Sequence, residues 1–189
     1  MKLAIIFLFI FVAIGFALEP SQKAPDFALR DTNGKEMKMS DYQDKNVVLI
    51  FISTKCPYSN AFNVVMSKLA TDYSSKGIVF LGINSNKTEP VEQVAQHAKE
   101  KGLSFPVIKD PENKVADLYG AQVTPEAFVI DKTGIIRYHG ALGSSGRPTT
   151  DPAKATSDDI AAALDELLAG KQIVKAKTKA FGCTIKRVG

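Results

Sequence analysis

The sequence predicts an α/β fold in which a central mixed β-sheet is flanked by helices, and three observations support this class. The apolar run at residues 47–52 is rich in Val and Ile and too short for a typical helix, as a strand buried on both faces is. A helical repeat of apolar residues follows, and it leads to a second apolar run at residues 78–84. Residues 127–130 and 135–139 flank a polar turn, which is typical of a β-hairpin. The sheet should therefore combine parallel central strands with an antiparallel edge.

The size and charge of the chain narrow its class further. It has 189 residues, of which 45% are hydrophobic and 23% charged, which suits one domain with a full core. The formal net charge is +4, and it becomes +3 without residues 1–17, which contain one Lys and no acidic residue. Such a small charge does not create the field of a nucleic-acid-binding protein, so we expect no nucleic-acid partner.

Residues 1–17 have the parts of a secretory signal peptide. Lys2 is followed by the apolar run at residues 3–14, and Gly15-Phe16-Ala17 places small residues at the positions that determine cleavage. We predict export to the periplasm or the extracellular space, with no stable membrane insertion after cleavage. An uncleaved membrane anchor is the alternative, because the apolar run is near the lower limit for a spanning helix. Export would place both cysteines where disulfides persist.

Residues 18–170 form the predicted domain, and its elements alternate in type. The leading segment carries a hairpin, with arms at residues 27–29 and 35–39 joined by the turn dipeptide Asn33-Gly34. The remaining elements are separated mostly by Gly, Pro or polar turn residues. They are a strand at 47–52, a helix at 57–76, a strand at 78–84, a helix at 91–101, a strand at 105–108, a short helix at 112–119, the hairpin at 127–139, a mobile loop rich in Gly, Ser, Pro and Thr at 140–156 and a last helix at 157–169.

Residues 171–189 form a basic tail, which carries Cys183 near its end. The basic residues of the tail are Lys171, Lys175, Lys177, Lys179, Lys186 and Arg187. We expect the tail to be solvated, because it is charged and lacks a long apolar period. A patch for an acidic partner or for a membrane surface is the alternative.

Cys56 is the first candidate for chemistry. It follows the predicted buried strand and precedes Pro57, which suits the first position of a helix because its missing N–H group is no loss there. Unpaired N–H groups and the positive end of the helix dipole favour a thiolate at this place, and Lys55 adds a positive charge. Since the thiolate is the nucleophilic form, we predict a reactive sulfur. A small buried cysteine at the end of a strand is the alternative.

Cys-Pro-Tyr-Ser at residues 56–59, placed between a strand and a helix, resembles the thioredoxin superfamily. The segments Ala24-Pro25-Asp26-Phe27-Ala28-Leu29, Gly34-Lys35 and Met39-Ser40-Asp41-Tyr42 resemble the redoxin or AhpC/TSA group, named for alkyl hydroperoxide reductase and thiol-specific antioxidant. This resemblance covers residues 22–142, and residues 182–187 resemble the ending of exported redoxin-domain proteins. The resemblance implies a thioredoxin-like fold with an N-terminal β-hairpin extension.

The resemblance also assigns a role to Thr124 and Pro125. In this superfamily the matching Thr-Pro bond is cis and lies against the active-site sulfur, so these two residues are expected to face Cys56. The backbone of Val123 and Thr124 would then pair with an extended substrate segment. Pro57 and Tyr58, next to the cysteine, complete the expected substrate-binding residues. An ordinary turn before a strand is the alternative, because proline is common there.

A thioredoxin-type reductase usually has Cys-x-x-Cys, but here Ser59 replaces the second cysteine. Three mechanisms follow. Cys56 attacks a disulfide and Cys183 resolves the mixed disulfide; or Cys56 attacks a peroxide and Cys183 or an external thiol regenerates it; or both cysteines form a structural bridge without catalysis. The first two need a protein or small-molecule disulfide, or a peroxide, as substrate and an external thiol as electron donor. None of the three needs a cofactor.

The peroxide mechanism can be compared with the motif of the peroxiredoxins. In these antioxidant enzymes a Thr or Ser three residues before the reactive cysteine holds the peroxide, and Ser53 fills this position. Their preceding proline is replaced by Leu49, so half of the motif is absent. Arg137 is the only arginine in the later strands, and whether it reaches the site is left open. We therefore expect disulfide exchange, with thiol peroxidase as the alternative.

Copper binding is a third possibility, since Cys56, Cys183 and His139 are ligand types that copper prefers. The nearby pair of cysteines found in copper chaperones of this fold is missing, and the sequence has no zinc-ligand spacing, so we expect no metal site. The other histidine, His97, lies away from the apolar face of its helix and is expected at the surface.

Overall fold

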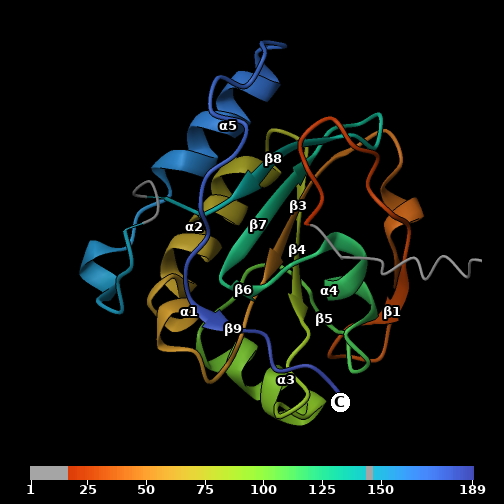
Figure 1. Ribbon diagram of the computed structural model, residues 1–189, viewed down its shortest axis with the longest axis vertical. Helices are drawn as coiled ribbons and strands as arrows, with labels where there is room; N and C mark the ends of the chain where they lie inside the picture. The colour runs from red at the N-terminus through yellow and green to blue at the C-terminus, as the bar shows by residue number, and fades with distance from the viewer. Residues whose placement is uncertain (1–16, 144–146) are drawn as a thin grey trace, which may run out of the picture.

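The computed structural model describes residues 17–143 and 147–189, and its centre is a mixed five-stranded sheet (Figure 1). The strand order is β5-β4-β3-β7-β8. These strands are β3 (Asn46–Phe51), β4 (Ile78–Asn84), β5 (Val107–Lys109), β7 (Glu126–Ile130) and β8 (Ile136–Gly140). Strands β3, β4 and β5 are parallel, whereas β7 is antiparallel to both β3 and β8. The predicted α/β class, the mixed sheet and its antiparallel edge are confirmed.

Two groups of residues lie outside this description. Residues 1–16 include almost all of the predicted signal peptide, and residues 144–146 belong to the predicted mobile loop. In the described part of the chain, no helix is long and apolar enough to cross a membrane.

Strand β3 lies in the middle of the sheet because it is apolar on both faces. All of its residues after Asn46 are buried. Successive side chains point to opposite faces of a strand. Val48 and Ile50 accordingly enter one apolar core, and Leu49 and Phe51 enter the other. A strand of this kind needs cover on both sides, which the helices provide.

The two faces are covered by different elements, which Figure 1 shows on opposite sides of the sheet. The first face packs against α2 (Asn63–Ser74), α5 (Asp158–Leu168) and α3 (Val91–Glu100). The second face packs against α4 (Lys114–Tyr119) and the N-terminal hairpin of β1 (Ala28–Arg30) and β2 (Glu36–Lys38). The predicted hairpin extension is therefore confirmed, and it closes the second core.

The first helix differs from the prediction of one continuous helix over residues 57–76. It is divided into α1 (Pro57–Ala61) and α2, with Phe62 between them. The N–H group of Phe62 donates to the Ser59 carbonyl oxygen at 3.1 Å, three residues back rather than four. This tighter turn ends α1, so the helix that begins after Cys56 is only five residues long.

The prediction of a solvated tail at residues 171–189 is wrong. Ile173 and Ile185 are buried, and each belongs to one of the two cores. The backbone of Ala176 and Thr178 pairs with His139 on β8, with two N···O distances of 3.0 Å. Further on, β9 (Cys183–Thr184) pairs with β6 (Val123–Thr124). The tail is held because its few apolar residues and its backbone groups find partners on the domain.

The buried face of β4 offers a test of this core. We expect Leu81→Ala, at a fully buried position, to lower the free energy of unfolding by about 2–5 kcal/mol, because the lost methyl groups leave a cavity. Urea unfolding measures it. The control is Val64→Ala on the exposed side of α2, where 73% of the residue is accessible and the change should stay within about 0.5 kcal/mol. Similar small effects in both variants would contradict the assignment of Leu81 to the core.

Candidate active site

Cys56 occupies the N-cap position of α1, in the loop that leads from β3 into this helix, and only 1% of its surface is exposed. Its Sγ atom has three polar neighbours. The backbone N–H groups of Ser59 and Cys183 both donate to Sγ at 3.4 Å. The thiol itself donates to the carbonyl oxygen of Thr124 at 3.2 Å. The sulfur is therefore enclosed by backbone groups from three distant parts of the chain.

Thr124 and Pro125 form the wall opposite α1. The peptide bond between them is cis, and both residues are buried. The contact from Cys56 to Thr124 joins residues 68 positions apart. Pro57 is exposed beside the sulfur, and the ring of Tyr58 meets Phe181 at a centroid distance of 6.2 Å. The residues that the sequence singled out for substrate binding thus lie around Cys56.

The edge that was expected to receive a substrate segment is occupied by the chain itself. In the antiparallel pairing of β6 with β9, Val123 lies opposite Thr184, and Thr124 lies opposite Cys183. The pairing continues with the N–H group of Ile185, which donates to Gln122 O at 2.9 Å. Figure 1 shows β9 beside β6 and α1. The tail thereby brings Cys183 to the sulfur of Cys56.

Both cysteines are free thiols in this structure. The pKa of Cys183 is raised to about 11, first by burial and then by the hydrogen bond to Cys56 and the charge of that sulfur. Lys186 and the N–H group of Tyr58 act in the opposite direction but do not cancel these causes. Burial and the neighbouring sulfur thus both favour the protonated thiol of Cys183.

The loop that carries Cys56 is held by a buried carboxylate that the sequence analysis missed. Glu89, which is 1% exposed, accepts hydrogen bonds from the hydroxyl of Ser53 at 2.5 Å and from Asn84 at 2.6 Å. It also accepts from the N–H groups of Thr54 at 2.8 Å and Lys55 at 3.2 Å. The only sequence signal was a polar run directly after β4, which is equally typical of an exposed loop.

These bonds determine the charge of Glu89 and the role of Ser53. Burial alone would raise the pKa of Glu89, but the hydrogen bonds that it accepts outweigh burial and hold the pKa below its usual range. Ser53 gives its only hydroxyl proton to Glu89, and its Oγ accepts from the N–H group of Cys56 at 3.1 Å. Ser53 therefore connects the carboxylate to the cysteine backbone.

Ser59 is fully enclosed, with 1% of its surface exposed. Its Oγ accepts a hydrogen bond from the N–H group of Ser53 at 3.1 Å, while its own N–H group donates to Cys56. The contact with the sulfur thus comes from the backbone of Ser59, and the hydroxyl group ties the two ends of the loop together.

A second buried carboxylate holds the opposite wall, and it was also missed. Glu126 accepts from the N–H groups of Gln122 at 2.8 Å and Val123 at 3.1 Å, immediately before the cis bond. Its other oxygen lies 2.6 Å from Nε2 of His139, and both side chains are buried. Glu126 begins an otherwise apolar strand, and a charged residue at the start of a strand gives no local signal that it is buried.

Three candidates from the sequence lie elsewhere, and none of them joins the cysteines. The ring of His139 stacks on Phe128 at a centroid distance of 4.2 Å. Within residues 17–143 and 147–189, no three His, Cys, Asp or Glu side chains are grouped as metal ligands would be, so the copper hypothesis gains no support. His97, expected at the surface, is half-buried, and its Nε2 lies 3.3 Å from Nδ2 of Asn63.

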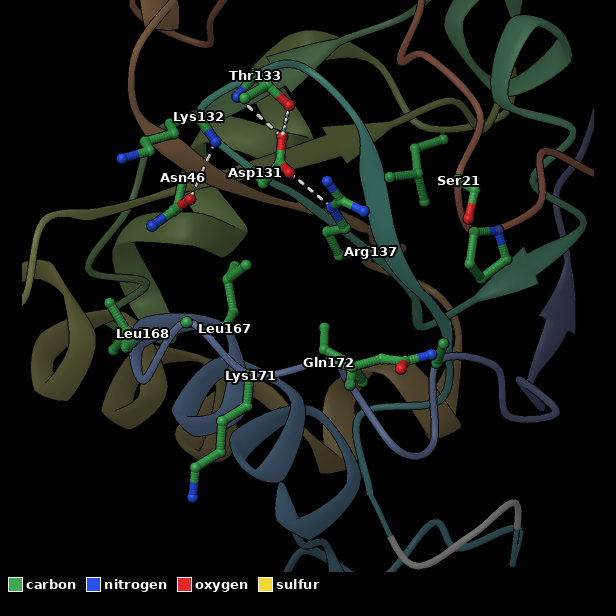
Figure 2. A pocket seen from close by; sticks show the side chains of 15 residues that line it. Ser21, Asn46, Asp131, Lys132, Thr133, Arg137, Leu167, Leu168, Lys171 and Gln172 are labelled. Carbon is green, nitrogen blue, oxygen red and sulfur yellow. Dashed lines mark hydrogen bonds and ion pairs between the residues drawn. The ribbon is translucent and has the colours of Figure 1, made fainter.

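Arg137, the third candidate, lies in a cavity that Cys56 does not line. Its Nε lies 2.6 Å from the carboxylate of Asp131, and both residues line a cavity of about 580 Å³ (Figure 2). Lys132, Leu167 and other residues from the turn between β7 and β8 and from the end of α5 complete the lining, and no residue around Cys56 takes part. The question that the sequence left open is answered: Arg137 does not reach the site.

The chain is similar to known proteins over most of its length. Residues 20–139 match the AhpC/TSA family. The thiol-disulfide oxidoreductase ResA of Geobacillus thermodenitrificans is 34% identical over 121 residues, which cover 64% of this chain and 68% of that protein. The crystal structure of a hypothetical protein from Sinorhizobium meliloti 1021 is 31% identical with a TM-score of 0.84, and the match covers 92% of this chain and 97% of that one. The crystal structure of the thioredoxin domain of a thiol-disulfide oxidoreductase from Bacteroides vulgatus is 15% identical, with a TM-score of 0.65. The match covers 80% of this chain and 99% of that one, and it confirms the thioredoxin-like fold.

Glu89→Gln tests the buried carboxylate. Both carboxylate oxygens of Glu89 accept hydrogen bonds, and the substitution would replace one of them with an amide nitrogen, which cannot accept. We therefore expect the free energy of unfolding at pH 7 to fall by about 1–3 kcal/mol. The folded-state pKa of Glu89 lies below its ordinary value of 4.5, so this stabilisation is present above that pH and is lost as the pH falls through the folded-state pKa. Urea unfolding at several pH values should therefore show the difference from the wild type shrinking below about pH 4.5. Glu92→Gln, on the exposed first turn of α3, is the control. A difference that does not change with pH would contradict this role.

Cys56→Ser tests the cause of the raised pKa of Cys183. We expect the pKa of Cys183 to fall from about 11 towards the ordinary value of 9, because the effects of the neighbouring sulfur disappear while burial remains. The pH dependence of alkylation by iodoacetamide, followed by peptide mass, measures this pKa. Lys186→Gln should shift the same pKa upwards, because Lys186 lowers it. Equal values in the wild type and Cys56→Ser would show that the two sulfurs do not interact.

Proposed function

The chain belongs to the AhpC/TSA family, and from this premise we propose that it is a thiol-disulfide oxidoreductase in which Cys56 is the nucleophile and Cys183 the resolving cysteine. One observation carries the proposal: the N–H group of Cys183 lies 3.4 Å from Sγ of Cys56, although the two residues are 127 positions apart. The relative from Geobacillus thermodenitrificans is named a thiol-disulfide oxidoreductase, which supports the same reaction class.

The reaction proceeds in two exchanges. The Cys56 thiolate attacks one sulfur of a substrate disulfide, a mixed disulfide forms, and the other substrate sulfur leaves as a thiolate and takes up a proton. The Cys183 thiolate then attacks the sulfur of Cys56, the Cys56–Cys183 bond forms, and the second substrate sulfur leaves. The substrate disulfide gains two electrons and the protein dithiol loses them. An external dithiol reverses the change in the protein.

The order of the two cysteines follows from their surroundings. Backbone N–H groups of Ser59 and Cys183 point at the sulfur of Cys56, where they would stabilise a thiolate. The pKa of Cys183 is raised, first by burial and then by the hydrogen bond to Cys56 and the charge on that sulfur. That charge disappears when Cys56 enters a mixed disulfide, so Cys183 becomes easier to ionise at the step that requires its thiolate.

Peroxidase chemistry fits these residues less well. The hydroxyl of Ser53, which occupies the peroxide-holding position, already donates to Glu89 at 2.5 Å. Leu49, at the position of the missing proline, is a fully buried residue of β3. A purely structural bridge between Cys56 and Cys183 is the remaining alternative, and resistance of such a bridge to reduction would distinguish it from a catalytic pair. Disulfide exchange therefore remains the best-supported function, and its substrate is a protein or small-molecule disulfide.

We further propose that the protein is exported and acts in the periplasm or the extracellular space. The pattern of residues 1–17 supports a signal peptide. Export would place both cysteines in a compartment where disulfides form and persist. After expression in a bacterial host, the mass of the mature protein would locate the cleavage site. The cell fraction that contains this protein would identify its compartment.

Reduction of oxidised glutathione by the fully reduced protein tests the reaction. We expect Cys56→Ser to abolish it and Cys183→Ser to stop at a glutathione adduct on Cys56, which intact mass would detect. Ser59→Ala should keep most of the activity, because the contact with the sulfur comes from the backbone, even if the lost hydroxyl costs about 1–3 kcal/mol of stability. An equal loss of activity in Cys56→Ser and Ser59→Ala would contradict a mechanism in which Cys56 is the single nucleophile. Faster oxidation of Cys56 by hydrogen peroxide than by glutathione disulfide would instead favour a peroxidase.

A further inference from the structure

The sulfur of Cys56 is covered, although a nucleophile needs access to its substrate. Only 1% of Cys56 is exposed, and the cover includes β9 of the chain itself. The backbone groups of Val123 and Thr124 on that side are already paired with Thr184 and Cys183. One edge of a strand can pair with only one neighbour at a time. A substrate segment that uses this edge must therefore replace β9.

Residues 181–185, which we call the tail segment, fit the groove between β6 and α1 at successive positions. The ring of Phe181 meets the edges of the rings of Tyr58 and Phe62, with centroid distances of 6.2 and 6.1 Å. Ile185 is 3% exposed and enters the second core. The groove thus accommodates an aromatic side chain at its start and an aliphatic one at its end.

Gly182 is the tightest point of the fit. Its φ angle of +150° is one that residues with a side chain rarely adopt. A Cβ atom at this position would overlap the carbonyl oxygen of Thr124. The position before Cys183 therefore accepts only glycine while the segment stays paired with β6.

The contacts beyond the groove are polar, and some of them reach buried side chains: Val188 N donates to Oδ1 of the buried Asn113 at 2.7 Å. Lys186 N donates to Asn86 Oδ1 at 2.9 Å, and the guanidinium of Arg187 pairs with the exposed Asp117 at 2.8 Å. Exposed ion pairs contribute about 0–1 kcal/mol, and β9 contains only two residues. Release of the tail segment therefore breaks this short pairing and exposes Ile185 and the half-buried Phe181, and a partner segment must supply equivalent contacts.

We propose that this groove is a binding site for an extended segment of a partner protein, in which a cysteine follows an aromatic residue and a glycine, and that the tail segment is its resident occupant. The proposal rests on the proposed function, because it gives the substrate class of the same site. The partner offers a disulfide whose cysteine takes the place of Cys183 above Cys56. After the first exchange, the tail segment returns and Cys183 completes the reaction.

The test uses the full chain and a fluorescein-labelled peptide with the sequence of residues 179–187, in which serine replaces the cysteine. Gly182→Val releases the tail segment, so we expect it to bind the peptide at least about tenfold more tightly than the wild type does. Iodoacetamide should also alkylate Cys56 at least about tenfold faster in this variant, because the groove is open for more of the time. Gly189→Val is the matched control, since a Cβ there meets nothing within 4 Å and both values should match those of the wild type.

A second peptide and a second variant complete the test. A peptide with alanine in place of the aromatic residue should bind at least about tenfold more weakly, because the contacts with Tyr58 and Phe62 are lost. If Gly182→Val does not fold, Phe181→Ala must show the same increase in peptide binding and alkylation. Absence of an increase in the folded variant overturns the inference. Peptide binding needs no electron transfer, so the two proposals can fail separately. Peptide binding without reduction of oxidised glutathione would refute only the proposed function. Reduction of oxidised glutathione without peptide binding would refute only this inference.

Discussion

The pairing of β9 with β6 is the contact on which the site depends. It is short, with two pairs of opposed residues, yet it has three consequences. It places Cys183 above the sulfur of Cys56, it covers that sulfur, and it fixes the end of a tail that would otherwise gain little from lying on the domain. A backbone edge can pair with only one neighbour at a time. In the proposed reaction, the resolving cysteine and the substrate therefore use the same edge in turn.

Two buried glutamates support this arrangement from either side. Glu89 collects donors from the loop before Cys56, and Glu126 collects donors from the turn before the cis bond. A buried carboxylate is tolerated only when its oxygens are hydrogen-bonded. Here the donors are backbone N–H groups of irregular segments, which would themselves be costly to bury without a partner. Each glutamate thus accepts hydrogen bonds from the backbone N–H groups of a loop. These N–H groups in return provide the partners that the buried carboxylate needs.

The replacement of Cys-x-x-Cys by Cys-x-x-Ser changes what the fold must provide. In the usual motif the second thiol lies one helical turn away. Here Ser59 uses its hydroxyl to hold Ser53, and the second thiol comes from the far end of the described chain. Its position depends on β9, on the aromatic contacts of Phe181 and on the burial of Ile185. In the proposed mechanism, the resolving step thereby depends on the docking of a whole segment.

The sequence by itself determined most of the fold and the position of Cys56, the candidate nucleophile. Apolar runs, helical repeats and turn residues are local signals, and they located the central strands, the hairpins and the order strand, Cys56, Pro57, helix. Local signals could not show that Phe62 divides the first helix, because a packed ring and one tightened turn cause the break. Nor could they show that Glu89 and Glu126 are buried, since polar residues at the ends of strands are usually solvated. Only the tertiary structure decided that the basic tail returns to β6 and brings Cys183 to Cys56, because its one short strand and its few apolar residues become stable only against partners far away in the sequence.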